Sequence, residues 1–293
     1  MVPSDSNDAR VLFRKERNSS EGALRRPLDA PAGGDHGGTV AGVETWIEAD
    51  GLHLHGYLAR PPVSSGSPGV VRALVLCHGF PAGPRGAATA GQTYPELADR
   101  IAGEAGWVVL TFNFRGAAGS EGNFSLAGWL ADLRAATTHL VDLAAVDRVW
   151  LAGFSTGGSL ALCAAGEDER VAGVAAFAAP ADFDAWAANA PAFLQHAREI
   201  GVVRDAAFPQ DFEAWARELH ETRPLALIGK VSPRPVLLVH GAADDTVPLM
   251  DARALADAAE GDVELRVLPG AGHRLRHDPR AIAVLLGWLD RQS

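Results

Sequence analysis

A serine flanked by small residues lies between a strand-like and a helix-like stretch of the chain. Residues 153–157 read Gly-Phe-Ser-Thr-Gly and fit the pattern G-x-S-x-G. An apolar, strand-like run precedes them (148–152), and small helix-forming residues follow (158–165). On so tight a turn the serine is pushed towards positive φ, and its hydroxyl stands clear of the backbone. The pattern predicts that Ser155 is a nucleophile; a plain glycine-rich loop is the alternative.

A serine hydroxyl needs a general base within about 3 Å, and that base needs an orienting acid. Two loops that each follow a predicted strand carry these residue types. The first (240–248) contains Asp244, and the second (269–273) ends at His273. Serine, acid, histidine is the chain order expected for a G-x-S-x-G hydrolase. The sequence therefore predicts Ser155 as nucleophile, Asp244 as acid and His273 as base.

Other residues compete for these roles. Asp245 and Asp182 are alternative acids, and His277, at the start of the last predicted helix, is the alternative base. His78 and His240 each precede a glycine at a strand end, and both are expected to be hydrogen-bonded residues that shape loops. The oxyanion of an acyl-transfer intermediate also needs donors, and the backbone N–H of Thr156 is predicted as one.

The remaining pattern predicts the elements that position these loops. Two alternating runs around an Asp-Gly turn predict a β-hairpin. Beyond it, short apolar strands alternate with helical stretches, which favours a mainly parallel sheet with helices on both faces. The eight predicted strands are 43–49, 52–58, 70–77, 107–112, 148–153, 171–177, 235–240 and 263–268.

Two segments depart from this alternation. Residues 1–42 are polar, charged and glycine-rich and are predicted to be a disordered tail, with a basic docking arm as the alternative. Residues 181–234 interrupt an ordered domain of residues 43–293 with aromatic side chains and prolines. This insertion is predicted to be a small lid over the carboxyl ends of the strands; a buried helical excursion is the other interpretation.

At these residues the chain resembles the α/β-hydrolase superfamily, and within it the small serine esterases, serine aminopeptidase-like and dienelactone-hydrolase-like members. The resemblance covers about residues 43–290 and rests on 78–80, 113–116, 119–122, 153–157, 241–248 and 272–273. It implies an α/β-hydrolase fold with a small helical lid. It assigns Asp244 rather than Asp245 as the acid and the N–H of Phe80 as the second oxyanion donor. It also implies that Arg115 and Glu121 brace the site.

The composition of the chain limits the classes of partner and cofactor that we expect it to bind. The formal net charge of −10 disfavours nucleic acid and anionic membranes. Cys77 and Cys163 lack metal-ligand spacing, so we expect no metal and no cofactor. No apolar run approaches the length of a membrane span, and the N-terminus has no apolar signal region, so a cytoplasmic location is expected.

The expected function is hydrolysis of a carboxylic ester (EC 3.1.1.-), with a small-molecule ester as partner. Residues 81–84 and the aromatic insertion favour a small to medium apolar acyl group. A serine aminopeptidase is the alternative, and an acyltransferase would use the same triad. A non-catalytic binding protein on this fold is the alternative from another class. The sequence does not predict the oligomeric state.

Overall fold

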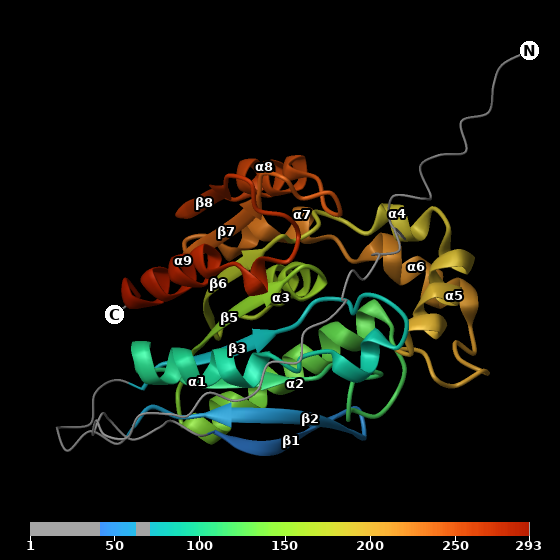
Figure 1. The fold of residues 1–293 in the computed structure, drawn as a ribbon, viewed down its shortest axis with the longest axis horizontal. Helices are drawn as coiled ribbons and strands as arrows, with labels where there is room; N and C mark the ends of the chain where they lie inside the picture. The colour runs from blue at the N-terminus through green and yellow to red at the C-terminus, as the bar shows by residue number, and fades with distance from the viewer. Residues whose placement is uncertain (1–41, 63–70, 293) are drawn as a thin grey trace, which may run out of the picture. The chain divides into compact units, whose positions relative to one another are not determined.

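A computed structural model describes residues 42–62 and 71–292 (Figure 1). Apart from Gly42, the predicted tail lies outside these ranges. The described chain forms an eight-stranded sheet with the order β1-β2-β4-β3-β5-β6-β7-β8. The strands from β3 to β8 pair in parallel, and β1 and β2 form the antiparallel edge. Their bounds are β1 Val43–Ala49, β2 Leu52–Ala59, β3 Ala73–Cys77, β4 Val108–Phe112, β5 Val149–Phe154, β6 Val171–Phe177, β7 Val236–Gly241 and β8 Val263–Leu268. The predicted fold class is confirmed.

The predicted hairpin turns at two residues with positive φ. Asp50 has φ 51° and Gly51 has φ 74°, the pair of left-handed conformations that a tight two-residue hairpin loop requires. This turn sets a register in which Ile47 faces Leu54, and both side chains are fully buried. One face of the hairpin therefore joins the core, as the alternating pattern predicts.

Helices cover both faces of the sheet. The helix pair α1 and α9 lies on one face, and the pair α2 and α3 lies on the other (Figure 1). The apolar sides of α1 and α9 share one core cluster with the strand residues Leu74 and Leu76. The helices around the sheet are α1 Tyr94–Ala105, α2 Leu126–Ala144, α3 Thr156–Glu167, α8 Leu249–Ala258 and α9 Pro279–Asp290, with short turns η2 Gly86–Thr89 and η4 Leu275–His277.

The insertion (181–234) connects β6 to β7 through short helices. They are α4 Asp184–Ala187, α5 Ala190–Ile200, α6 Phe212–Glu221, α7 Pro224–Leu227 and η3 Ile228–Val231. In Figure 1, α4, α5 and α6 lie beyond the end of the sheet to which the β3 arrow points. Phe183, Phe193 and Trp215 are buried, so half of the six Phe and Trp side chains in the insertion are packed away from solvent. Its action as a lid stays a prediction.

The two cysteines are buried and form no disulfide. Cys77 ends β3 and Cys163 lies in α3. Burial raises the pKa of the Cys163 thiol to about 12 and raises that of Cys77 as well. Both are small core residues, as the sequence suggests. Within the described ranges, no helix is both long and apolar enough to cross a membrane.

Candidate active site

Ser155 occupies a strained turn between β5 and α3. Its φ is 51° and its ψ is −127°, a conformation that residues with a Cβ rarely adopt. The Ser155 N–H donates to the carbonyl of Phe177 at 2.7 Å, which ties the turn to the end of β6. A Cβ at Gly158 would lie 2.9 Å from the carbonyl oxygen of Gly153. The glycines therefore let α3 start close under the strand, as the sequence pattern predicts.

The structure brings Ser155, His273 and Asp244 together. Oγ of Ser155 lies 3.0 Å from Nε2 of His273, and Nδ1 of His273 lies 2.9 Å from Oδ2 of Asp244. A carboxylate can only accept, so Nδ1 carries the proton and Nε2 is left to accept from the serine hydroxyl. The Asp244 side chain is fully buried, whereas that of His273 is 22% exposed. This arrangement can take a proton from Ser155.

The acid and base loops approach closely because Gly241 has no side chain. A Cβ there would lie 2.7 Å from the carbonyl oxygen of Gly272. Two backbone hydrogen bonds of 2.9 Å join the loops, from Ala242 N–H to Leu268 and from Ala243 N–H to Ala271. The loops that follow β7 and β8 therefore bring Asp244 next to His273.

Asp244 is held as a carboxylate. Its Oδ1 accepts from the N–H groups of Thr246 and Val247, both at 2.9 Å. Burial acts to raise the pKa of Asp244. The hydrogen bond and charge of His273, together with the two backbone donors, outweigh burial and hold that pKa below its usual value. The buried carboxylate is thus fixed in both position and charge.

The competing candidates lie elsewhere. Asp245 is exposed beside Asp244, and His277 is exposed in η4. Asp182 accepts the N–H of Asp184 at 2.9 Å. His240 is fully buried; its Nε2 donates to the carbonyl of Val247 at 2.9 Å and lies 3.4 Å from Oδ2 of Asp244. His240 therefore shapes the acid loop.

The two predicted oxyanion donors flank Ser155. Neither the Thr156 N–H, at the start of α3, nor the Phe80 N–H has an acceptor among the described residues. A Cβ at Gly79 would lie 2.9 Å from Cβ of Ser155, which places the Gly79–Phe80 peptide directly against the serine. Both N–H groups are therefore unengaged beside Ser155, which is what the predicted role as oxyanion donors requires.

His78 fixes the orientation of that peptide. Its Nδ1 donates to the carbonyl of Gly79 at 2.7 Å, and its Nε2 accepts from the N–H of Phe114 at 3.2 Å. Burial lowers the pKa of His78 to about 4, so the ring stays neutral at neutral pH. The C=O and N–H of a trans peptide point in opposite directions. By holding the Gly79 carbonyl, His78 therefore turns the Phe80 N–H away from itself.

Arg115 braces the neighbouring loop, whereas Glu121 lies further out. Nη2 of Arg115 lies 2.7 Å from Oδ1 of the fully buried Asp132, and the Arg115 carbonyl accepts from the Trp129 indole at 3.0 Å. Glu121 is 55% exposed and accepts the N–H of His53, on β2, at 2.7 Å. Neither residue contacts the three residues at the site.

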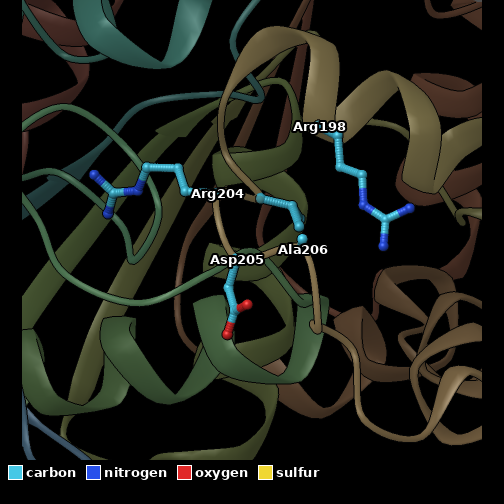
Figure 2. Close-up of a pocket in the computed structure, with 5 residues that line it drawn as sticks. Arg198, Arg204, Asp205 and Ala206 are labelled. Atoms are coloured by element: carbon cyan, nitrogen blue, oxygen red, sulfur yellow. The ribbon is translucent and has the colours of Figure 1, made fainter.

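A hollow of about 430 Å³ in the insertion is lined by Arg198, Val203, Arg204, Asp205 and Ala206. Figure 2 draws these lining residues as sticks. The two guanidinium groups point away from one another. Each donates to main-chain carbonyls, Arg198 to Phe208 at 3.0 Å and Arg204 to Ser120 at 2.6 Å. The hollow therefore lacks a converging charged site. In the described ranges, no three His, Cys, Asp or Glu side chains are grouped to hold a metal ion.

The alpha/beta hydrolase family profile matches residues 74–285 of the sequence, more than half of the chain. The chain belongs to this family. In this alpha/beta hydrolase, the matched region includes Ser155, Asp244 and His273. No curated protein matches the sequence.

Many solved structures share the fold. Est1E from Butyrivibrio proteoclasticus, bound to ferulic acid, is 21% identical with a TM-score of 0.61; 85% of this chain and 97% of that one are covered. An esterase from Pyrococcus furiosus is 18% identical with a TM-score of 0.62, covering 86% and 91%. An acylaminoacyl peptidase from Pyrococcus horikoshii is 16% identical with a TM-score of 0.61, covering 86% of this chain and 42% of that one. At such identities the likeness concerns the fold.

Proposed function

We propose that this alpha/beta hydrolase cleaves a carboxylic ester of a small to medium acyl group through an acyl-enzyme intermediate. The observation that carries the proposal is the continuous contact from Asp244 through His273 to the hydroxyl of Ser155. A serine hydroxyl becomes nucleophilic when a histidine accepts its proton and a buried carboxylate orients that histidine.

The proposed reaction has two halves. Oγ of Ser155 attacks the ester carbonyl while Nε2 of His273 takes the hydroxyl proton. The N–H groups of Phe80 and Thr156 stabilise the oxyanion, and Asp244 stabilises the imidazolium. Collapse of the tetrahedral intermediate breaks the bond to the alcohol oxygen, which leaves with the proton from His273. Water, deprotonated by His273, then attacks the acyl-enzyme. The bond between the acyl carbon and Oγ of Ser155 breaks, the carboxylic acid leaves and His273 returns the proton to Oγ.

A peptidase of the serine aminopeptidase type is the second candidate, and the charges of the insertion argue against it. Such an enzyme needs a free acidic side chain to hold the substrate amine. Asp184 is already paired with the Arg223 guanidinium at 3.1 Å, and Nδ1 of His220 lies 3.0 Å from the same carboxylate. The other acidic residues considered as amine anchors lie on different elements. Asp182 is in the loop before α4, Glu199 is in α5 and Glu213 is in α6.

Covalent labelling tests whether Ser155 is a nucleophile at all. We expect a fluorophosphonate to modify the wild type at Ser155 and not to modify Ser155→Ala. Ser159→Ala is a matched control, because Ser159 lies one turn further along α3 and only donates to the carbonyl of Pro180 at 2.7 Å. It should be labelled like the wild type. Equal labelling of Ser155→Ala would remove the proposal, and a wild type that is not labelled would favour a non-catalytic binding protein.

A substrate panel separates the remaining activities. Aryl esters from acetyl to octanoyl, a hydroxycinnamate ester and acylated or free aminoacyl amides should be compared by kcat/KM. The proposal expects ester turnover with an optimum among short or medium acyl groups. Preference for the amides would favour the peptidase. Acyl transfer to an added alcohol in excess of hydrolysis would favour an acyltransferase.

A further inference from the structure

The side chain of Phe80 joins the body of the hydrolase to the insertion. Phe80 is half-buried, and five rings surround it. The body supplies two of them and α4 and α5 supply three. The ring-centroid distances are 5.0 Å to Phe124, 5.9 Å to Trp129, 5.0 Å to Trp186, 5.4 Å to Phe193 and 6.2 Å to His196. Phe80, the predicted oxyanion donor, is therefore held by ring contacts from both the body and the insertion.

The clamp on the insertion side is itself held firmly. Trp186 stacks on Phe193 with centroids 4.2 Å apart, and Phe193 stacks on Trp215 at 5.9 Å. The indole N–H of Trp215 donates to the carbonyl of Phe124 at 3.2 Å, and the N–H of Phe124 donates to Val202 at 2.9 Å. The stack is thus anchored to the same body residue that contacts Phe80.

Two features besides the ring contacts restrain the Gly79–Phe80 peptide. His78 holds the carbonyl of Gly79 at 2.7 Å, but glycine itself allows the backbone to rotate. Pro81 limits Phe80 to extended conformations. Because the Phe80 N–H has no acceptor among the described residues, its direction depends on the hydrogen bond from His78 to the Gly79 carbonyl and on where the ring of Phe80 is packed.

We propose that the insertion is a positioning element of the oxyanion hole. Trp186 and Phe193 act through Phe80: by fixing its ring, they hold the Phe80 N–H against Ser155. The inference rests on the proposed hydrolase function and extends it. It gives the insertion a part in every turnover, including turnover of substrates whose acyl group is too short to touch it.

The test compares Trp186→Leu and Phe193→Leu with the matched control Phe212→Leu. Phe212 is an insertion aromatic that contacts Trp215, at 6.0 Å, and is not among the rings around Phe80. Acetyl esters and the corresponding thionoesters serve as substrates, because sulfur accepts hydrogen bonds from an oxyanion hole poorly. We expect the two clamp variants to lose about 10-fold or more in kcat on the oxo ester, with KM nearly constant. Their preference for oxo over thiono ester should fall by a similar factor.

The outcomes are distinguishable. An unchanged oxo/thiono ratio in Trp186→Leu, or a loss confined to KM, would overturn the inference and leave the aromatics as a pocket wall. If the variant at the buried Phe193 does not fold, the variant at the partly buried Trp186 decides alone. If the wild type is labelled normally by the fluorophosphonate and Trp186→Leu keeps the oxo/thiono ratio of the wild type, only this inference is overturned. A wild type without labelling or turnover sinks the proposed function and the inference together.

Discussion

Nε2 of His273 lies 3.0 Å from Oγ of Ser155, although 118 residues separate them in the chain. Ser155 is carried by the turn after β5, and His273 by the loop after β8. The two meet because parallel strands bring their carboxyl ends to one edge of the sheet. The contact therefore depends on correct pairing across β5, β6, β7 and β8.

Replacing the buried acid should slow the chemistry without unfolding the protein. Asp244→Asn keeps the shape of the side chain but lets His273 adopt the wrong tautomer. We expect kcat on an aryl ester to fall by about 10³-fold or more, with a smaller change in KM. Asp245→Asn is the matched control, since Asp245 is exposed and Asp244 contacts His273. Equal losses in the two variants would contradict the assigned acid.

Burial of His78 should make stability depend on pH. Its pKa is about 4 in the folded protein and about 6.5 when unfolded. Between these values the unfolded chain binds more protons, so the free energy of unfolding falls as pH falls from about 6.5 to 4, by about 3 kcal/mol for this group. His78→Asn retains a donor for the Gly79 carbonyl and should flatten that slope. Urea unfolding at several pH values measures it, and the exposed His277→Asn should retain the wild-type slope.

The substitution Gly79→Ala adds one methyl group and tests whether the close approach of Gly79 to Ser155 matters for activity. A Cβ in Gly79→Ala would lie 2.8 Å from the carbonyl oxygen of Phe154, so the peptide that carries the Phe80 N–H must shift. We expect fluorophosphonate labelling to slow by about 10²-fold, the scale of losing one oxyanion donor. Gly287→Ala, in α9 with open surroundings, should label normally and raise the melting temperature. Normal labelling of Gly79→Ala would argue against Phe80 as a donor.

The buried ion pair beside the site should matter far more than a surface pair. Arg115→Met leaves the carboxylate of Asp132 buried without its partner, and we expect a loss of about 3–5 kcal/mol in unfolding free energy. Arg134→Met removes an exposed pair with Glu167 and should cost less than about 1 kcal/mol. Denaturant melts of both variants give the comparison, and similar costs would show that Arg115 is not a brace.

Local patterns were sufficient to predict the sheet and three of its loops. Ser155, Asp244 and His273 each follow an apolar run, and such runs identify the carboxyl ends of buried strands. The Asp50-Gly51 turn likewise carries its geometry in its residue types. These features depend on neighbours in sequence, so the predicted fold and the predicted juxtaposition of loops agree with the structure.

The surroundings of the site depend on distant residues and could not be predicted in the same way. The ring of Phe80 meets Trp186 and Phe193, more than one hundred positions away. No spacing rule reveals that Asp184 is neutralised by Arg223. A histidine that precedes a glycine at a strand end indicates that His78 and His240 shape loops. This pattern does not predict which atoms the two histidines bind by hydrogen bonds.

The two native thiols, Cys77 and Cys163, are expected not to react with thiol reagents in the folded protein. Both lie in the core with raised pKa values, and they are the only cysteines in the sequence. A cysteine introduced at the exposed residue directly after α4, as Ala188→Cys, would therefore be the one site open to a maleimide dye in the native protein. Fluorescence from that site could follow the insertion in real time, from ester binding to release of the acid.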